Sequence, residues 1–171
     1  SDNVKTGFIS PSLFKTGETK IYGYLDSFYE APLLFANPKA DIFKYGTDIL
    51  LNTVLKLFEL NKNIQLIFAM DDAMKTPLIK SFIEFLNENK SLSGRWVFID
   101  GQINPEQFLA SSDMILIPER TNTLSMLHLI SMHYGCVPVV SRCGYINDSM
   151  EDIFDNIKTG CGFKTPHTLL R

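Results

Sequence analysis

Residues 113–144, DMILIPERTNTLSMLHLISMHYGCVPVVSRCG, contain one complete strand-helix-strand pattern. Two short apolar runs, 114–117 and 137–140, lie on either side of a polar loop and a mostly apolar stretch of helical length, 124–134. Such an order is typical of two parallel strands that are joined by a right-handed crossover helix. This unit therefore predicts a parallel β-sheet.

The same alternation of short apolar runs and helical stretches continues on both sides of this unit. Upstream, the pattern predicts strands over 32–36, 64–69 and 96–99 and helices over 47–60, 76–89 and 104–112. Downstream, a last helix is expected over 148–157, where apolar residues share one face. Five strands that alternate with helices predict a Rossmann-like open parallel sheet with helices on both faces.

Ligands of open parallel sheets bind beyond the carboxyl ends of the strands. Two loops follow the last two expected strands, 118–123 and 141–147, and both are rich in polar residues. We therefore expect a binding site to include these loops.

The expected domain organisation is one Rossmann-like, donor-binding domain over residues 31–171, preceded by an N-terminal arm, residues 1–30. A chain of 171 residues is long enough to bury a sizeable core in one domain. The arm has too many aromatic residues for a disordered linker and shows no clear period. We expect it to pack on the domain or on a part of the protein that this chain lacks.

Composition and charge give no support to several classes of partner. The net charge of −3 gives no basis for binding nucleic acid or an anionic membrane. No apolar run approaches the roughly 20 residues of a membrane-spanning helix, and the N-terminus lacks the pattern of a secretion signal. Cys136, Cys143 and Cys161 lack the short spacings of zinc sites, so we expect reduced thiols and neither metal nor cofactor. These features predict a cytoplasmic protein.

Four motifs occur in a fixed order between Pro32 and Thr165. They are PLLFA at 32–36 with GTDIL at 46–50, SDMILIP at 112–118, YGCVPVV at 134–140, and RCGYIND at 142–148 with GCGF at 160–163. In their order and spacing these motifs resemble the C-terminal, nucleotide-sugar-binding half of glycogen and starch synthases. Those enzymes are two-domain retaining glycosyltransferases with the GT-B fold.

The resemblance implies a hexosyltransferase that moves glucose, or a similar sugar, from an ADP- or UDP-sugar to a glycan acceptor. The N-terminal GT-B domain, which binds the acceptor in such enzymes, is absent from this chain. The chain alone is therefore not expected to be active.

The resemblance also implies which basic residues bind the donor. An arginine and a lysine five positions apart clasp the donor diphosphate in these synthases, and Lys39 and Lys44 have that separation. Tyr45 is then one extra residue before Gly46, and without this shift the two positions fall on Ala40 and Tyr45. A lysine retains the charge of an arginine but loses its bidentate fork. The alternative is that both are solvated loop lysines.

The donor loop departs from the synthase pattern. Counting from Pro118 places the glutamate of the synthases at Asn122, which is also a good helix-capping residue. The residues that follow it, and the pair after the last expected strand, complete the expected donor contacts: Thr123, Leu124, Ser125, Met126, Gly144 and Tyr145. Ser125 and Tyr145 occupy positions where the synthases have glycine. Gly101 and Gln102 are expected near the base.

The expected chemistry is capture of a diphosphate without a metal ion. A helix that begins near Leu124 presents free amides at the carboxyl end of a strand, and two lysine ammonium groups complement them. Such groups also stabilise the diphosphate that leaves when the glycosidic bond breaks.

Other functional classes remain as alternatives. The substitutions at Asn122, Ser125 and Tyr145 are compatible with a catalytically degenerate module that serves as a scaffold or binds a glycan or protein. A nicotinamide-dependent Rossmann enzyme is disfavoured, because no glycine-x-glycine-x-x-glycine turn follows the first strand. A response-regulator-like fold shares the layout, but only Asp71 and Asp72 support it.

Overall fold

The computed structural model describes residues 19–26, 31–60, 63–121, 125–155 and 162–165. The structural statements that follow refer to these residues. Several features predicted above lie outside the described residues: Asn122, Thr123, Leu124, Cys161 and most of the N-terminal arm, residues 1–18 and 27–30.

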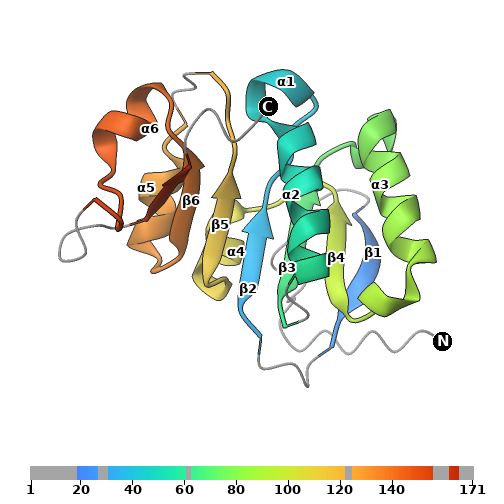
Figure 1. Cartoon of the computed structure of the whole chain (residues 1–171). Helices are drawn as coiled ribbons and strands as arrows, with labels where there is room; N and C mark the ends of the chain where they lie inside the picture. Colours follow the sequence, from blue (N-terminus) through green and yellow to red (C-terminus); the bar gives the residue numbers. More distant parts are fainter. Residues whose placement is uncertain (1–18, 27–30, 61–62, 122–124, 156–161, 166–171) are drawn as a thin grey trace.

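The described residues form one sheet of seven strands, six of which run parallel (Figure 1). The strands are β1 (Lys20–Leu25), β2 (Leu33–Ala36), β3 (Gln65–Met70), β4 (Arg95–Asp100), β5 (Met114–Ile117), β6 (Val137–Ser141) and β7 (Phe163–Thr165). Their spatial order is β1-β4-β3-β2-β5-β6-β7, and β1 pairs antiparallel with β4. The predicted Rossmann-like class is confirmed, and the sheet has two further edge strands, the antiparallel β1 and the parallel β7.

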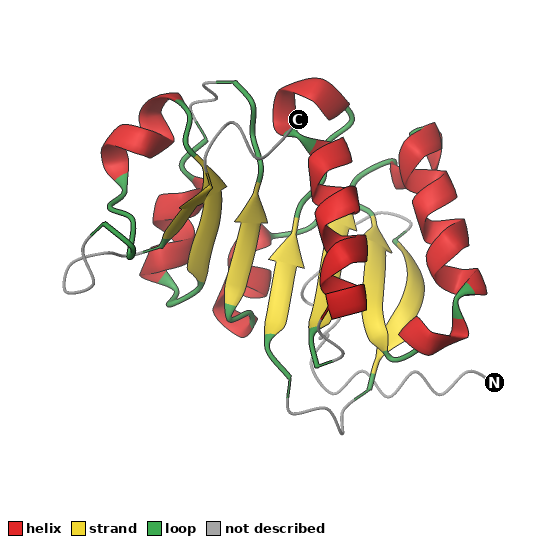
Figure 2. Cartoon of the chain, in the orientation of Figure 1, coloured by secondary structure: helices red, strands yellow, loops and turns green. Residues whose placement is uncertain are grey.

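Helices cover both faces of the sheet (Figure 2). They are α1 (Ile42–Tyr45), α2 (Thr47–Leu60), α3 (Pro77–Glu88), α4 (Pro105–Ser111), α5 (Leu127–His133) and α6 (Gly144–Ser149), with short 3-10 turns η2 (Ala73–Lys75) and η3 (Lys90–Leu92). One core lies between the sheet and the helices α2 and α3, and a second core includes α4, α5 and α6.

The two cores follow from the alternation of side chains along each strand. In β2, Leu34 packs with α2 and α3, whereas Phe35 points to the opposite face and stacks on Phe108 of α4 with ring centroids 5.5 Å apart. The central strand β3 is buried along its whole length, as expected for a strand that helices cover on both faces.

The predicted strands and the helices upstream of residue 113 are confirmed with small shifts at their ends, and helix α2 spans the predicted residues. Part of the N-terminal arm, Lys20–Leu25, forms strand β1 at the edge of the sheet. The pattern did not predict this strand, because only half of its residues turn inward and Gly23 interrupts it with a φ of 74°.

The predicted loop over 141–147 is wrong, and so is the described part of the helix predicted over 148–157, residues 148–155. Helix α6 begins earlier, at Gly144, and ends at Ser149, and Met150 is extended. Asp152 is buried, and its carboxylate accepts hydrogen bonds from the amides of Phe154 (3.0 Å) and Lys164 (3.2 Å). An aspartate that bonds backbone amides in this way favours a turn over a helix.

The predicted start of the next-to-last helix, near Leu124, is also corrected. Helix α5 begins at Leu127, and the amide of Leu127 donates to Ser125 Oγ at 3.4 Å. The serine side chain takes part in the turn that precedes the helix, so Ser125 and Met126 lie outside it. The free amides expected from the sequence therefore belong to a helix of seven residues.

In the described part of the chain, none of the helices has the length and apolar character needed to cross a membrane.

Candidate functional site

The order of the strands reverses at β2, which lies between β3 and β5. At such a switch point the chain leaves neighbouring strands in opposite directions, and a crevice forms beyond their carboxyl ends. The loop after β2 carries Lys39 and Lys44, and the loop after β5 begins with Pro118, Glu119 and Arg120. Figure 1 shows α1, which contains Lys44, at the same edge of the sheet as the arrowheads of β2 and β5.

Local hydrogen bonds shape the loop that carries the lysines. Thr47 Oγ1 accepts from the Lys39 amide at 3.1 Å and donates to the Lys39 carbonyl at 2.9 Å. The Asp41 carboxylate accepts from the Lys44 amide at 3.0 Å and caps α1. Gly46 ends α1 with a φ of 63°, a conformation that glycine adopts without a steric penalty. Both lysines are thus placed by bonds to their own backbone.

The loops after β2 and β5 are in direct contact. The Arg120 amide donates to the Lys44 carbonyl at 3.1 Å, and the Arg120 guanidinium bonds both carboxylate oxygens of Asp48 at 2.7 Å. The same guanidinium lies over the Phe43 ring, 4.8 Å from its centroid. A bidentate ion pair of this kind fixes the orientation of the two side chains as well as the distance between them. The pair therefore fastens the second loop to the first.

Glu119, which lies between Pro118 and Arg120 in the loop after β5, has a buried side chain. Its exposed fraction is 5%, and burial raises its pKa to about 7, while Lys39 and, to a smaller extent, Lys44 act in the opposite direction. Burial lowers the pKa of Lys39, and the charge of Glu119 partly offsets this effect. Both predicted lysines thus lie where their charges act on the same acidic residue.

This acidic residue was not among the site residues predicted from the sequence. The sequence does show a glutamate directly after the strand that ends at Ile117, one position beyond Pro118. Burial of its carboxyl is a tertiary property, because it depends on the loop after β2 and on the segment after β6.

The segment after β6 contacts the other side of the loop after β5. Cys143 Sγ donates to the Glu119 carbonyl at 3.3 Å and contacts the Thr121 carbonyl at 3.8 Å. Burial raises the pKa of the Cys143 thiol, so the sulfur remains a neutral donor near neutral pH. Two loops that follow different strands are therefore joined at Glu119.

Gly144 and Tyr145, which the sequence placed at the donor, are the first two residues of α6. The Tyr145 ring meets the buried His128 ring edge-on, with centroids 5.9 Å apart. His128 Nε2 and Ser149 Oγ lie 2.7 Å apart, and Ser149 Oγ also donates to the Tyr145 carbonyl at 2.7 Å. Tyr145 is thus part of the contact between α5 and α6.

The other predicted donor residues lie along the same edge of the sheet. Gly101 and Gln102 follow β4 directly, where the Gly101 amide donates to the Met70 carbonyl at 3.1 Å and Gln102 is exposed. Ser125 is half-buried and Met126 is exposed before α5. Within the described residues, no three His, Cys, Asp or Glu side chains are grouped so that they could hold a metal ion.

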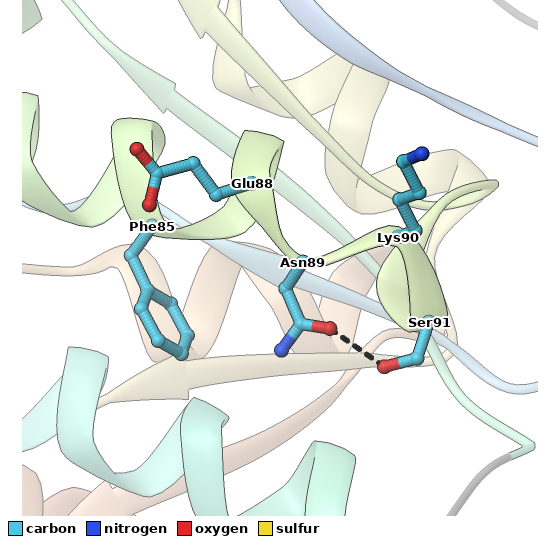
Figure 3. A pocket seen from close by; sticks show the side chains of 5 residues that line it. All are labelled: Phe85, Glu88, Asn89, Lys90 and Ser91. Carbon is cyan, nitrogen blue, oxygen red and sulfur yellow. Dashed lines mark hydrogen bonds between the residues drawn. The ribbon is translucent and has the colours of Figure 1, made fainter.

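A surface hollow of about 520 Å³ is present elsewhere in the structure, and Figure 3 shows the side chains that line it. It is open to solvent and is lined by the end of α3 and by η3: Phe85, Glu88, Asn89, Lys90 and Ser91. Asn89 Oδ1 accepts from Ser91 Oγ at 2.8 Å within it. The hollow precedes β4 and therefore lies at the amino edge of the sheet, opposite the lysine pair.

Solved structures with the same fold are glycosyltransferases. The catalytic domain of starch synthase IV from Arabidopsis thaliana, bound to ADP and acarbose, superposes on 83% of this chain and 29% of its own, with a TM-score of 0.67 at 20% identity. Anabaena Alr3699/HepE in complex with UDP superposes on 80% of this chain and 35% of its own, with a TM-score of 0.61 at 14% identity. The chain therefore has the Rossmann-like fold of one half of a GT-B glycosyltransferase.

Sequence comparison points to one group of these enzymes. Glycogen synthase 2 from Bradyrhizobium diazoefficiens is 29% identical over 140 residues, which are 82% of this chain and 28% of the synthase. No protein-family model matches the chain. The resemblance to the nucleotide-sugar-binding half of glycogen and starch synthases is confirmed, and the chain spans less than a third of the synthase that it matches.

Proposed function

We propose that this chain is the donor-binding half of a hexosyltransferase that takes a sugar, glucose in the first instance, from an ADP- or UDP-sugar and transfers it to a glycan. The observation that carries the proposal is the placement of Lys39 and Lys44 at the switch point of the sheet, beside the loop after β5. Starch synthase IV with ADP and HepE with UDP, which share the fold, support a nucleoside diphosphate as the ligand.

The diphosphate of the donor carries two negative charges, which the lysine ammonium groups would neutralise. Positive groups that are already in place stabilise the charge that develops on a leaving diphosphate. The glycan acceptor and the groups around its reacting hydroxyl would belong to an N-terminal GT-B domain, so we expect no turnover from these 171 residues alone. We also propose a cytoplasmic location, where nucleotide sugars are available.

Calorimetric titration with ADP-glucose and UDP-glucose tests the proposal. Wild type is expected to bind at least one of them, and the double variant Lys39→Ala, Lys44→Ala is expected to lose binding. Each hydrogen bond from a charged lysine to a phosphate contributes about 1.5–3 kcal/mol. Loss of both lysines therefore weakens binding at least about a hundredfold. Lys90→Ala, at the opposite edge of the sheet, is the matched control and is expected to bind as wild type does.

Binding that survives the double variant unchanged would contradict the assignment of the lysines. A failure of wild type to bind any nucleotide sugar, with binding of an oligosaccharide retained, would favour the degenerate module instead. Asn122, Ser125 and Tyr145 are the residues that favour this alternative.

A further inference from the structure

The lysine pair of the proposed donor site already has a counter-charge within the chain. Glu119 is buried, and its carboxyl is the acidic group on which both Lys39 and Lys44 act. The residue before it, Pro118, packs against Gly46, and the residue after it, Arg120, bonds the Lys44 carbonyl at 3.1 Å. The backbone on both sides of Glu119 is therefore held against the loop of the lysines.

A diphosphate that binds the lysines must replace this carboxylate as their counter-charge, or bind the lysines together with it. A deprotonated Glu119 next to two phosphate charges would place like charges together in a partly buried site, which is unfavourable. A protonated Glu119 removes the repulsion and can donate a hydrogen bond to a phosphate oxygen.

We propose that Glu119 controls the charge of the donor site, so that a nucleotide sugar binds with this carboxyl in its protonated form. The inference rests on the proposed function and adds the protonation state in which the lysines are available to bind the donor. At higher pH the carboxylate neutralises the lysines and competes with the donor, and at lower pH the lysines are available.

Among the described residues, the other charged or titratable groups close to Glu119 differ from it in behaviour. The Arg120 guanidinium is bound to Asp48 of α2, and burial raises the pKa of the Cys143 thiol at the start of α6. Lys39 is the second candidate, because burial lowers its pKa. Loss of its charge would also weaken binding at alkaline pH, but it would do so whether or not residue 119 can titrate.

The supporting electrostatics agree with this geometry. The pKa of Glu119 is raised to about 7 before any ligand is present, so about half of the molecules are protonated at that pH. A bound diphosphate raises this pKa further. Linkage then requires uptake of roughly half a proton per donor at pH 7, and a loss of up to about tenfold in affinity from pH 6 to pH 8.

ADP-glucose and UDP-glucose are suitable probes, because the charge of their diphosphate does not change over this range. Calorimetry in buffers of different ionisation enthalpy counts the protons taken up. Wild type is expected to show the uptake and the loss of affinity, and Glu119→Gln is expected to show neither and to bind up to about tenfold more tightly at pH 8. Glu88→Gln, in the hollow at the opposite edge, is expected to behave as wild type.

Three outcomes are distinguishable. Binding by wild type without proton uptake overturns this inference and leaves the proposed function intact, and so does an unchanged pH dependence in Glu119→Gln. Absence of binding in both proteins at every pH overturns the proposed function and this inference with it. If Glu119→Gln does not fold, carbon-13 NMR of the wild-type carboxyl groups tests the inference instead. One glutamate must then titrate near pH 7, and its pKa must rise when the nucleotide sugar binds.

Discussion

At Glu119, burial and two neighbouring ammonium groups act in opposite directions on one carboxyl. Burial is the larger effect, so the pKa is raised to about 7 from a usual value near 4.3. A carboxyl that binds its proton more tightly in the folded state stabilises the fold at low pH. That contribution is complete below the pKa of the unfolded chain and is lost as the pH rises through about 7.

Glu119→Gln removes this titration and is expected to stabilise the protein selectively at high pH. The gain in free energy of unfolding over wild type at pH 8 should exceed the gain at pH 5 by roughly 2 kcal/mol. Urea denaturation at the two pH values measures it, with Glu88→Gln as an exposed control. An equal difference at both pH values would show that Glu119 ionises as an ordinary glutamate does.

Among the elements, the contact between the loops after β2 and β5 depends on Gly46. A methyl group on this residue would overlap the carbonyl oxygen of Pro118, and the φ of 63° is unfavourable for any residue with a Cβ. Gly135 provides a comparison, because its φ is 77° but no atom lies within 4 Å of the position that a Cβ would take. A comparison of alanine variants at the two positions therefore distinguishes the cost of backbone strain from the cost of steric overlap.

We expect Gly135→Ala to cost about 1 kcal/mol of stability, from backbone strain alone. Gly46→Ala should cost about 2–4 kcal/mol and should weaken nucleotide-sugar binding, because the loop after β5 must move. Thermal unfolding and calorimetry compare the two variants. Equal costs would mean that the contact between Gly46 and Pro118 contributes nothing to the arrangement of the loops.

Elements with a clear hydrophobic period could be predicted from the sequence, whereas those formed by single polar contacts could not. Helix α2 was predicted to the residue, because its apolar stripe and flanking loops agree. The segment after α6 was predicted wrongly, because the burial of Asp152 and its ion pair with Arg142 at 2.9 Å replace helical hydrogen bonds there. A spacing of apolar residues does not reveal such a buried carboxylate.

In the molecule as a whole, the candidate site joins loops that are far apart in the sequence. Arg120 and Asp48 are separated by 72 positions and form the ion pair that fastens these loops. Sequence motifs could suggest Lys39 and Lys44 and a site beyond the carboxyl ends of the strands, whereas the switch point at β2 came from the strand order. They could not suggest Glu119, whose properties arise only when the sheet brings three loops to one edge.

The position of the bound donor in the intact chain is best measured by NMR, as changes in amide chemical shift on addition of ADP-glucose or UDP-glucose. We predict changes at the loop after β2, at Glu119 and Arg120, and at Gly101 and Gln102. Changes confined to the hollow at 85–91, or no changes at saturating donor, would contradict a donor site at the switch point.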